Sequence, residues 1–216
     1  YSHKPLFSPR DLADIYIDGI MLQSDNPAVN LDFSAISVGY AMDLAIDNLR
    51  DRGVRSAMIN AGGNVRVIGD RAGRPWRIPI RRATGGGVLA ILTVSGDASI
   101  FTSSDYARNF IYEGKTYHAV IDPRTGYPAD GIHSATVLHN GSAALADAAS
   151  TALMVAGVSG WREIAQRMGI EYALLIDDAG TLHMTQAMAE RIQILDHDAD
   201  VAIAAPAPAA EASAER

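Results

Sequence analysis

An aspartate and a threonine four residues apart, Asp147 and Thr151, are well spaced to act together. They lie in the segment Ala-Asp-Ala-Ala-Ser-Thr-Ala at residues 146–152. Residues i and i+4 share one face of a helix, so the carboxylate and the hydroxyl would stand side by side. Such oxygen ligands suit Mg²⁺ or Ca²⁺ better than zinc. The alternative is an aspartate on an exposed helix face without a ligand, and the residues alone leave both interpretations open.

A second candidate is the stretch Tyr-His-Ala-Val-Ile-Asp-Pro-Arg-Thr-Gly-Tyr-Pro at residues 117–128. Its apolar run predicts a strand that ends at Asp122, because Pro123 holds the residue before it in an extended conformation. Side chains alternate along a strand, so His118 and Asp122 would share one face. The pattern predicts a loop that displays charged and hydroxyl groups, although an Asp-Pro turn can also be only a turn.

Two further polar segments have both a structural and a functional interpretation. Thr-Ser-Ser-Asp-Tyr at 102–106, which includes Ser103, could line a polar pocket, but capping of a helix N-terminus is the preferred interpretation. Asn-Ala-Gly-Gly-Asn at 60–64 allows either a tight turn, which we prefer, or a close backbone approach to a ligand. The histidines other than His118 show no metal-ligand spacing and are interpreted as surface or turn residues: His3, His133, His139, His183 and His197.

The composition excludes several classes of protein. The chain has 216 residues, of which 48% are hydrophobic and 20% charged, so it can bury a substantial core in one or two domains. A formal net charge of -7, without a cluster of Lys and Arg, argues against nucleic-acid binding. Without cysteines there are no disulfides, thiolate catalysis or cysteine-based metal sites. The chain begins at Tyr1 rather than Met, so we expect a processed, excised or incomplete sequence, compatible with a removed signal peptide.

The elements that must position these residues are mostly strands linked by hairpins. No apolar run approaches the roughly 20 residues that a transmembrane helix needs. Strands outnumber helices, so we predict an α+β fold with antiparallel sheets and packed helices. Helices are predicted at 35–52, at 144–155 before Gly157, and from Ser159 to Gly169. Strands are predicted at 13–17, 55–59, 65–68, 76–80, 88–94, 134–138, 172–176 and 181–184.

Two features of this pattern lead to specific expectations. On the first helix, apolar residues recur at helical spacing, and we interpret them as a stripe that packs in the core: Ile36, Tyr40, Leu44, Ala45 and Leu49. After Asp200 the sequence consists largely of Ala, Pro, Glu and Ser, so residues 201–216 are expected to form a disordered tail.

Taken together, the segments resemble the ApbE family of FAD:protein FMN transferases. The similarity spans roughly residues 31 to 184, and six motifs in the right order are far more specific than one. The matched segments are 31–43 (a helix entry like Asp-Leu-Gly-Gly-Ile-Ala-Lys-Gly-Tyr-Ala-x-Asp), 60–64 (Asn-x-Gly-Gly-Asp/Asn), 76–80 (Trp-x-x-x-Ile), 102–106 (Thr-Ser-Gly-Asp-Tyr), 118–126 (His-x-Ile-Asp-Pro-x-Thr-Gly) and 146–152 (Ala-Asp-Ala-x-x-Thr-Ala).

The resemblance implies a T-fold-like architecture and an enzyme that moves FMN from FAD to a Thr or Ser hydroxyl of a partner flavoprotein, releasing AMP. It implies Mg²⁺, with Mn²⁺ as an alternative, bound by Asp147, Thr151 and the backbone carbonyl of Ala35. His118 would lie near the phosphates and transfer a proton or stabilise an oxyanion, so His118 and Asp147 are the expected catalytic residues. The expected cofactor contacts are Asp32, Ser103, His118 and Ile121.

The resemblance also implies three regions and a location. Residues 1–30 would form a lead-in that could be the remnant of a longer N-terminal part. Residues 31–200 would form the flavin transferase domain, and residues 201–216 would form the tail. As in most of the family, the protein is expected in the periplasm or otherwise outside the cytoplasm. The sequence departs from the family where Val38 replaces a usual Lys, and where Ser34, Ser37 and Ser104 replace smaller residues. Only about thirty residues precede the first motif.

These departures keep two other functions open. An alkyl group at Val38 cannot neutralise phosphate charge, so the chain could be a catalytically silent module that binds FAD. Alternatively, water could replace the acceptor hydroxyl, and FAD would be hydrolysed to FMN and AMP.

Overall fold

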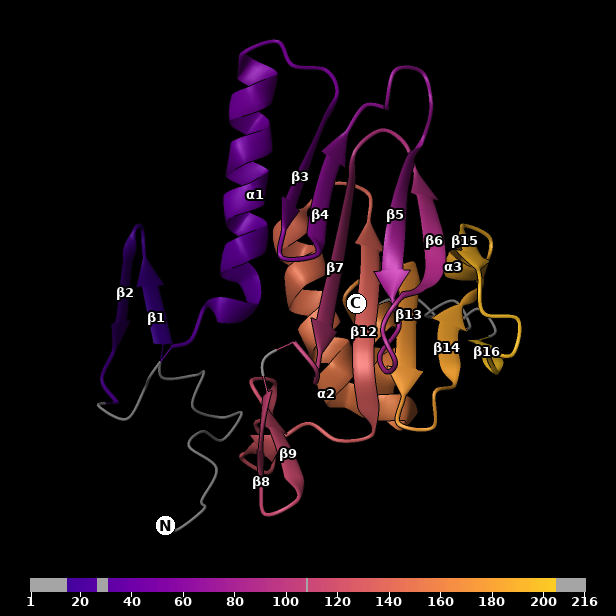
Figure 1. Ribbon diagram of the computed structural model, residues 1–216. Coiled ribbons are helices and arrows are strands. Elements are labelled where there is room, and N and C mark those ends of the chain that lie inside the picture. The colour runs from indigo at the N-terminus through magenta and orange to yellow at the C-terminus, as the bar shows by residue number, and fades with distance from the viewer. Residues whose placement is uncertain (1–14, 27–30, 108, 205–216) are drawn as a thin grey trace, which may run out of the picture.

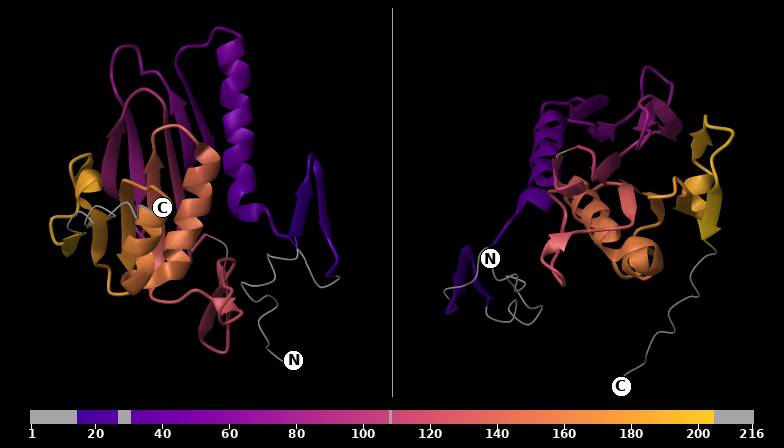
Figure 2. Two further views of the ribbon diagram at one scale, coloured as in Figure 1. Left: turned by 180° about the vertical axis from the view of Figure 1, so that it is seen from behind. Right: turned by 60° about the horizontal axis from the view of Figure 1, so that its bottom comes forward.

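The computed structural model describes residues 15–26, 31–107 and 109–204. In these residues a large sheet has helices on one face and a smaller sheet on the other (Figure 1). Figure 2 shows from behind how α1 and α2 cover the large sheet. Its strand order is β16 (Val201–Ala204), β14 (Leu182–Thr185), β13 (Tyr172–Asp177), β12 (Ile132–His139), β7 (Ala98–Ser104), β4 (Asn64–Ile68) and β3 (Ala57–Ala61).

The remaining elements complete an α+β fold, which confirms the predicted class. Only β14 and β16 pair in parallel among the described strands, and every other pair is antiparallel. The smaller sheet has the order β15 (Ile192–Ile194), β6 (Val88–Val94) and β5 (Trp76–Arg81). Two-stranded units are β1 (Ile15–Asp18) with β2 (Met21–Ser24), β8 (Asn109–Tyr112) with β9 (Lys115–His118), and β10 (Ile121–Asp122) with β11 (Tyr127–Pro128). The helices are α1 (Ser34–Asp51), α2 (Ala143–Arg167) and α3 (Gln186–Ala189).

Strand β7, for which the sequence predicted no strand, lies near the centre of the large sheet and contributes to both sides of the core. Its side chains alternate between the two faces. Ile100 packs in the cluster between the two sheets, whereas Phe101 packs in the cluster under the helices. The polar residues that follow on the same strand therefore also point to opposite faces of the sheet.

Helix α1 buries a different face from the predicted one. Its buried residues are Gly39, Met42 and Ile46. The predicted core stripe lies on the surface instead, with Tyr40 59% and Leu44 53% exposed. The core interpretation of that stripe was therefore wrong in the described part of the chain.

The missing side chain at Gly39 explains which face is buried. A Cβ atom at this position would lie 2.3 Å from the carbonyl oxygen of Ala143 on α2. Only a glycine lets the two helix backbones approach this closely, and the approach turns the Gly39 face inward. Hydrophobic spacing contains no information about such a contact.

Helix α2 consists of two pieces, as predicted from Gly157. This glycine has φ 68° and ψ -178°, which interrupts the helix within its 25 residues. The helix is long and apolar enough to cross a membrane by composition. However, it is broken in the middle, and it packs against β7 and β12 as a core helix of this fold.

The ends of the chain differ partly from the prediction. The hairpin expected at Asp18-Gly19 is confirmed as β1 and β2. Residues 201–204, assigned to a disordered tail, form strand β16 beside β14. Exposed and less exposed residues alternate along β16, and the last one, Ala204, is buried in the core. This short segment therefore has apolar surface to bury. The rest of the predicted tail, 205–216, and residues 1–14 and 27–30 of the lead-in lie outside the described residues.

Candidate functional site

Asp147 is buried, with 7% of its surface exposed, so the interpretation as an exposed helix residue was wrong. Its Oδ2 accepts a hydrogen bond of 2.9 Å from the backbone N–H of Gly39. Burial raises the pKa of the Asp147 carboxyl, and the Gly39 hydrogen bond offsets this only in part. No Lys or Arg among the described residues pairs with it. A buried carboxylate in this situation is stabilised by a bound cation.

Thr151 lies one turn after Asp147, at the contact between α2 and β7. Its Oγ1 is 2.9 Å from the Oγ of Ser103, which is also 2.8 Å from the Oγ of Ser150. Ser103 is the residue of its segment that points toward the helices. The structure thus brings Ser103 into hydrogen-bond distance of Thr151, one helical turn from Asp147.

The start of α1 contributes to the same region, one turn away from the predicted ligand. Asp147 accepts its hydrogen bond from the N–H of Gly39 on α1. The predicted ligand, Ala35, lies four residues earlier, in the first turn of the helix. The Ala35 carbonyl stays a predicted ligand. Asp32 is exposed, and its Oδ1 accepts a hydrogen bond of 2.7 Å from the N–H of Ser34. Hydrogen bonds from Ser34 lower the pKa of Asp32, so this carboxylate is charged at the helix entry.

Asp43 positions α2, a role that the sequence analysis did not recognise. Its carboxylate accepts hydrogen bonds from the N–H groups of Ala143 at 2.9 Å and Ala144 at 3.1 Å. These are unpaired donors of the first turn of α2, where a negative charge is favourable. Arg66 pairs with Asp43 at 3.0 Å. Burial acts to raise the pKa of Asp43, but these donors outweigh it and lower the pKa. The only sequence signal was its place at the end of the 31–43 segment.

A cavity of about 340 Å³ lies on the other face of β7. It is lined by the 60–64 turn and by Thr102, Ser104 and Tyr106, and we call it the motif cavity. The backbone N–H of Thr102 donates to the Oδ1 of Asn64 at 3.0 Å and joins the two segments. The capping interpretation of 102–106 was wrong because these residues end a strand and continue into a loop. The predicted turn at 60–64 is confirmed, since it connects β3 to β4 with two glycines of positive φ.

His118 and Asp122 are both buried, but they do not lie on one continuous strand. Strand β9 ends at His118 and β10 begins at Ile121, so the predicted shared face was wrong. The Nε2 of His118 is 2.9 Å from the carbonyl oxygen of Ala129. A carbonyl only accepts, so Nε2 carries the proton. The Nδ1 is buried without a hydrogen-bond partner among the described residues, which leaves it as the basic nitrogen.

Asp122 has a structural partner. Its Oδ1 accepts a hydrogen bond of 2.9 Å from the Nε of Arg124, and its Oδ2 accepts one of 2.8 Å from Nη2 of the same residue. This ion pair lowers the pKa of Asp122. The same Nη2 donates to the carbonyl oxygen of Val155 on α2 at 2.9 Å. The loop is therefore fastened to the helix that carries Asp147. Ile121, a predicted cofactor contact, is 47% exposed beside it.

His133, interpreted from the sequence as a surface or turn residue, holds the 102–106 segment. It lies where the register of β12 shifts between Ile132 and Ser134, and such a bulge can redirect a side chain. Its Nδ1 is 2.6 Å from the Oδ2 of Asp105, and its carbonyl oxygen accepts the N–H of Asp105 at 3.0 Å. His133 therefore helps to position the segment that lines the motif cavity, because Asp105 is part of that segment.

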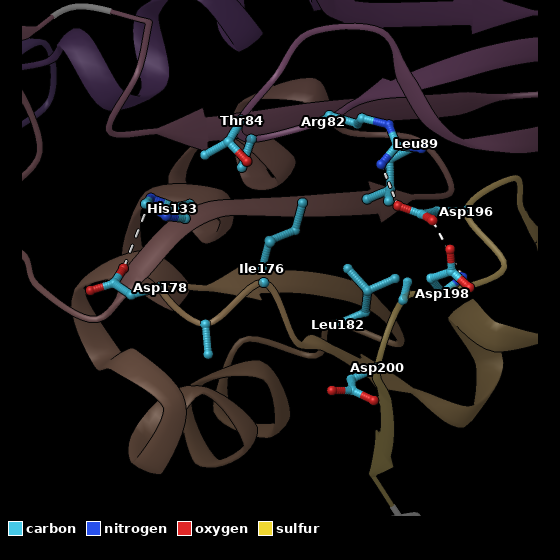
Figure 3. Close-up of a pocket in the computed structure, with 14 residues that line it drawn as sticks. Arg82, Thr84, Leu89, His133, Ile176, Asp178, Leu182, Asp196, Asp198 and Asp200 are labelled. Carbon is cyan, nitrogen blue, oxygen red and sulfur yellow. Dashed lines mark hydrogen bonds and ion pairs between the residues drawn. The ribbon is translucent and has the colours of Figure 1, made fainter.

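Figure 3 shows that His133 also borders a second cavity, of about 300 Å³. Ile176 and Leu182 contribute apolar surface to it, and Asp178 and Asp200 contribute carboxylates. None of the residues that the sequence analysis assigned to chemistry is among the described residues that line it. We assign no ligand to this cavity.

The oxygen atoms around Asp147 fit a hard divalent cation. No group of three or more His, Asp or Glu side chains in the described residues could hold a metal ion. An ion at Asp147 would therefore depend on the Thr151 hydroxyl, a backbone carbonyl and oxygen atoms of a bound ligand. Mg²⁺ commonly takes such a mixed set, with one carboxylate and phosphate oxygens.

Comparison with known proteins places these segments in one family. The sequence profile described as the ApbE family matches residues 5–174. The FAD:protein FMN transferase of Rhodobacter capsulatus is 40% identical over 185 residues, which are 86% of this chain and 35% of that protein. The FAD:protein FMN transferase of Vibrio cholerae is 34% identical over 163 residues, 74% of this chain and 48% of that protein. The chain thus spans less than half the length of these two curated relatives.

Solved structures agree with the fold. The ApbE protein of Thermotoga maritima superposes with a TM-score of 0.76 at 30% identity, covering 83% of this chain and 59% of that one. The flavinyl transferase ApbE of Pseudomonas stutzeri gives a TM-score of 0.68 at 33% identity, covering 83% and 56%.

Proposed function

This chain belongs to the ApbE family, and from that membership and the geometry above we propose that it transfers FMN from FAD to a Thr or Ser hydroxyl of a partner flavoprotein. AMP is the second product, and the reaction depends on Mg²⁺ or Mn²⁺. One observation carries the proposal. Three separate matched segments meet on α2, because Gly39 donates to Asp147 at 2.9 Å and Ser103 lies 2.9 Å from the hydroxyl of Thr151, one turn along the same helix.

The proposed reaction exchanges one phosphorus–oxygen bond for another. The acceptor hydroxyl oxygen attacks the phosphorus of the FMN half, and the bond from that phosphorus to the bridging oxygen breaks. AMP leaves with the bridging oxygen, and the hydroxyl proton passes to a base. A bound divalent cation would neutralise the charge of the phosphates. Asp147 and Thr151 would hold it, with the Ala35 carbonyl as the third protein ligand.

We propose His118 as the base. Its Nε2–H is occupied by the Ala129 carbonyl, which fixes the ring and leaves Nδ1 able to accept a proton. The described contacts do not join His118 to Asp147. The role therefore requires FAD and the acceptor hydroxyl to lie between the two residues.

The motif cavity is the proposed site for one ring system of FAD. Its volume of about 340 Å³ is within the range of small-ligand sites but is too small for a whole dinucleotide. The phosphates would then extend toward the Asp147 side of β7, around Ser103. Asp32 and Ile121, which are both exposed, are proposed to contact the nucleotide outside the cavity.

The test is incubation with FAD, Mg²⁺ and an acceptor flavoprotein, followed by mass spectrometry of the acceptor and quantification of AMP. We expect the acceptor to gain the mass of FMN with an equal amount of AMP, and Asp147→Asn to lose both. Asp51→Asn changes an exposed carboxylate on α1 and should retain full activity. An unlabelled acceptor, under conditions in which a known relative labels it, would contradict the proposal.

The same experiment separates the other two functions. AMP release without labelled acceptor would indicate hydrolysis of FAD. Bound but intact FAD would indicate a silent binding module, which one observation favours: Val38 is 38% exposed on α1 and offers no charge to a phosphate.

We also propose a location outside the cytoplasm, in the periplasm, on the resemblance to the family alone. Fractionation of cells that express the full gene product tests this, and recovery with cytoplasmic markers would contradict it.

A further inference from the structure

A cavity of about 970 Å³ opens at the edges of the two sheets. It lies between β3 of the large sheet and β5 of the smaller one, both of which are edge strands (Figure 1). We call it the arginine cavity, and its main lining residues are Met58, Arg71, Arg74, Trp76, Arg77 and Thr93.

The three arginines of this cavity have no carboxylate partner among the described residues. In contrast, Arg66 and Arg124 each pair with an aspartate. The whole chain has a net charge of -7, so three unpaired guanidinium groups in one place are a local reversal of its charge. Guanidinium groups bind carboxylates and phosphates in a bidentate manner.

Trp76 adds an unsatisfied hydrogen-bond donor. Its ring packs against the core between the sheets, and its Nε1 is buried without a partner in the described part of the chain. A buried donor without an acceptor costs free energy, so such groups are rare without a reason. A carbonyl or carboxylate oxygen of a ligand would satisfy this donor once the ring tilts toward the cavity, because Nε1 itself has no exposed surface.

The arginine cavity lies beside the motif cavity along the same two strands. On β3, Met58 lines the first cavity and Asn60 the second, and alternation places both on one face about 7 Å apart. On β5, Trp76 and Ile78 have the same relationship. The two cavities are therefore neighbours along the facing edges of β3 and β5.

We propose that the arginine cavity binds an acidic, extended segment of the flavin-acceptor protein, an inference that rests on the proposed function. Acidic side chains would pair with Arg71 and Arg74 in the turn before β5. Others would reach Arg77 around the edge of β5, because alternation turns Arg77 to the opposite face of this strand from Trp76. A backbone carbonyl would accept the Trp76 N–H. The arginines extend along a turn and a strand, which suits charges distributed along a peptide.

Direct binding tests this without any turnover. The probe is a fluorescein-labelled hexaglutamate peptide, measured by anisotropy, with hexalysine as the control peptide. We expect Arg71→Glu with Arg74→Glu to weaken hexaglutamate binding about tenfold. The matched control, Arg162→Glu with Arg167→Glu on α2, makes the same charge change elsewhere and should alter binding less than about twofold. Trp76→Phe retains the packing and should weaken binding by a smaller factor.

Two results would overturn the inference. One is equal weakening by both arginine pairs, which would mean that only net charge matters. The other is displacement of the peptide by equimolar AMP, which would make the cavity a nucleotide phosphate site.

Transfer kinetics separate this inference from the proposed function. With a flavoprotein that the wild type labels, the Arg71 and Arg74 changes should raise KM for the acceptor about tenfold and leave KM for FAD unchanged. An unchanged acceptor KM would contradict the inference while the transferase activity stands. If the wild type labels no acceptor, the proposed function fails, and the peptide measurement still decides whether the cavity binds acidic segments.

Discussion

Helix α1 has two faces that look alike in sequence and differ completely in the structure. The braced face, with Gly39, Met42, Asp43 and Ile46, packs on α2 and the sheet. The apolar face, with Ile36, Tyr40 and Leu44, is exposed in the described part of the chain. The difference is that a glycine and an aspartate on the braced face contact α2 directly, and Met42 and Ile46 are buried beside them.

The braced face also connects the fold to the site. Gly39 donates to Asp147, and four residues later Asp43 holds the first N–H groups of the helix that carries Asp147. A single turn of α1 therefore sets both the position of α2 and the surroundings of its buried carboxylate. Substitutions on the two faces should have very different effects.

The largest effect should come from Gly39→Ala. The added Cβ would collide with the Ala143 carbonyl at 2.3 Å, so the helices must separate. We expect a loss of about 3 kcal/mol in the free energy of unfolding, measured by urea denaturation. Gly160→Ala is the matched control, because its Cβ would meet only the Ala156 side chain at 3.4 Å. That variant should be more stable by about 0.5 kcal/mol. Equal effects of the two changes would contradict the packing argument.

A smaller loss is expected for Asp43→Asn, which weakens the pairing with Arg66 and removes a charge from the start of α2. We expect about 2 kcal/mol at pH 7. The pKa of Asp43 is lowered by folding, so its contribution is present above the unfolded pKa and is lost as pH falls through the folded pKa. Urea denaturation at several pH values should show the difference from wild type shrinking below about pH 4. A difference that stays constant with pH would rule out the charge as its cause.

Asp147→Asn should have the opposite sign in metal-free buffer. Folding raises the pKa of Asp147, so its contribution is favourable below the unfolded pKa and is lost as pH rises. At pH 7 we expect the variant to melt about 2 to 4 °C higher, equivalent to about 1 kcal/mol. Adding Mg²⁺ should then raise the Tm of the wild type but not of the variant. Equal Mg²⁺ responses would place the ion elsewhere.

The smallest effect is expected on the apolar face. Leu44→Ser replaces a side chain that is 53% exposed and should change the free energy of unfolding by less than about 0.5 kcal/mol. A loss above about 1.5 kcal/mol in the 216-residue chain would show that this face has a partner in solution, and would erase the contrast between the two faces.

The sequence predicted the local elements well because their signals are local. Glycines marked the break at Gly157 and the turn at 60–64, and alternation marked β5 and β6. The i, i+4 spacing also predicted that Asp147 and Thr151 share a helix face, whereas the contact between Thr151 and Ser103 was not predicted. The magnesium ligands and the role of His118 are still predictions.

The misses share a physical cause, which is that they depend on contacts between distant residues. The orientation of α1 depends on a backbone of α2 more than 100 positions away. His133 holds the 102–106 segment through a bulge and a partner, Asp105, just after β7, and neither has a signature in a single sequence. Strand β16 was missed because its Ala-rich composition resembles that of a disordered segment, and only its pairing with β14 orders it.

The break in α2 has a practical consequence for engineering. The first half of the helix is anchored at its start by Asp43 and at its end by Arg124, which bonds to the Val155 carbonyl just before the break. Val158 and Ser159, immediately after it, are exposed. A reporter domain or an affinity tag spliced in there should leave the half that bears Asp147 undisturbed.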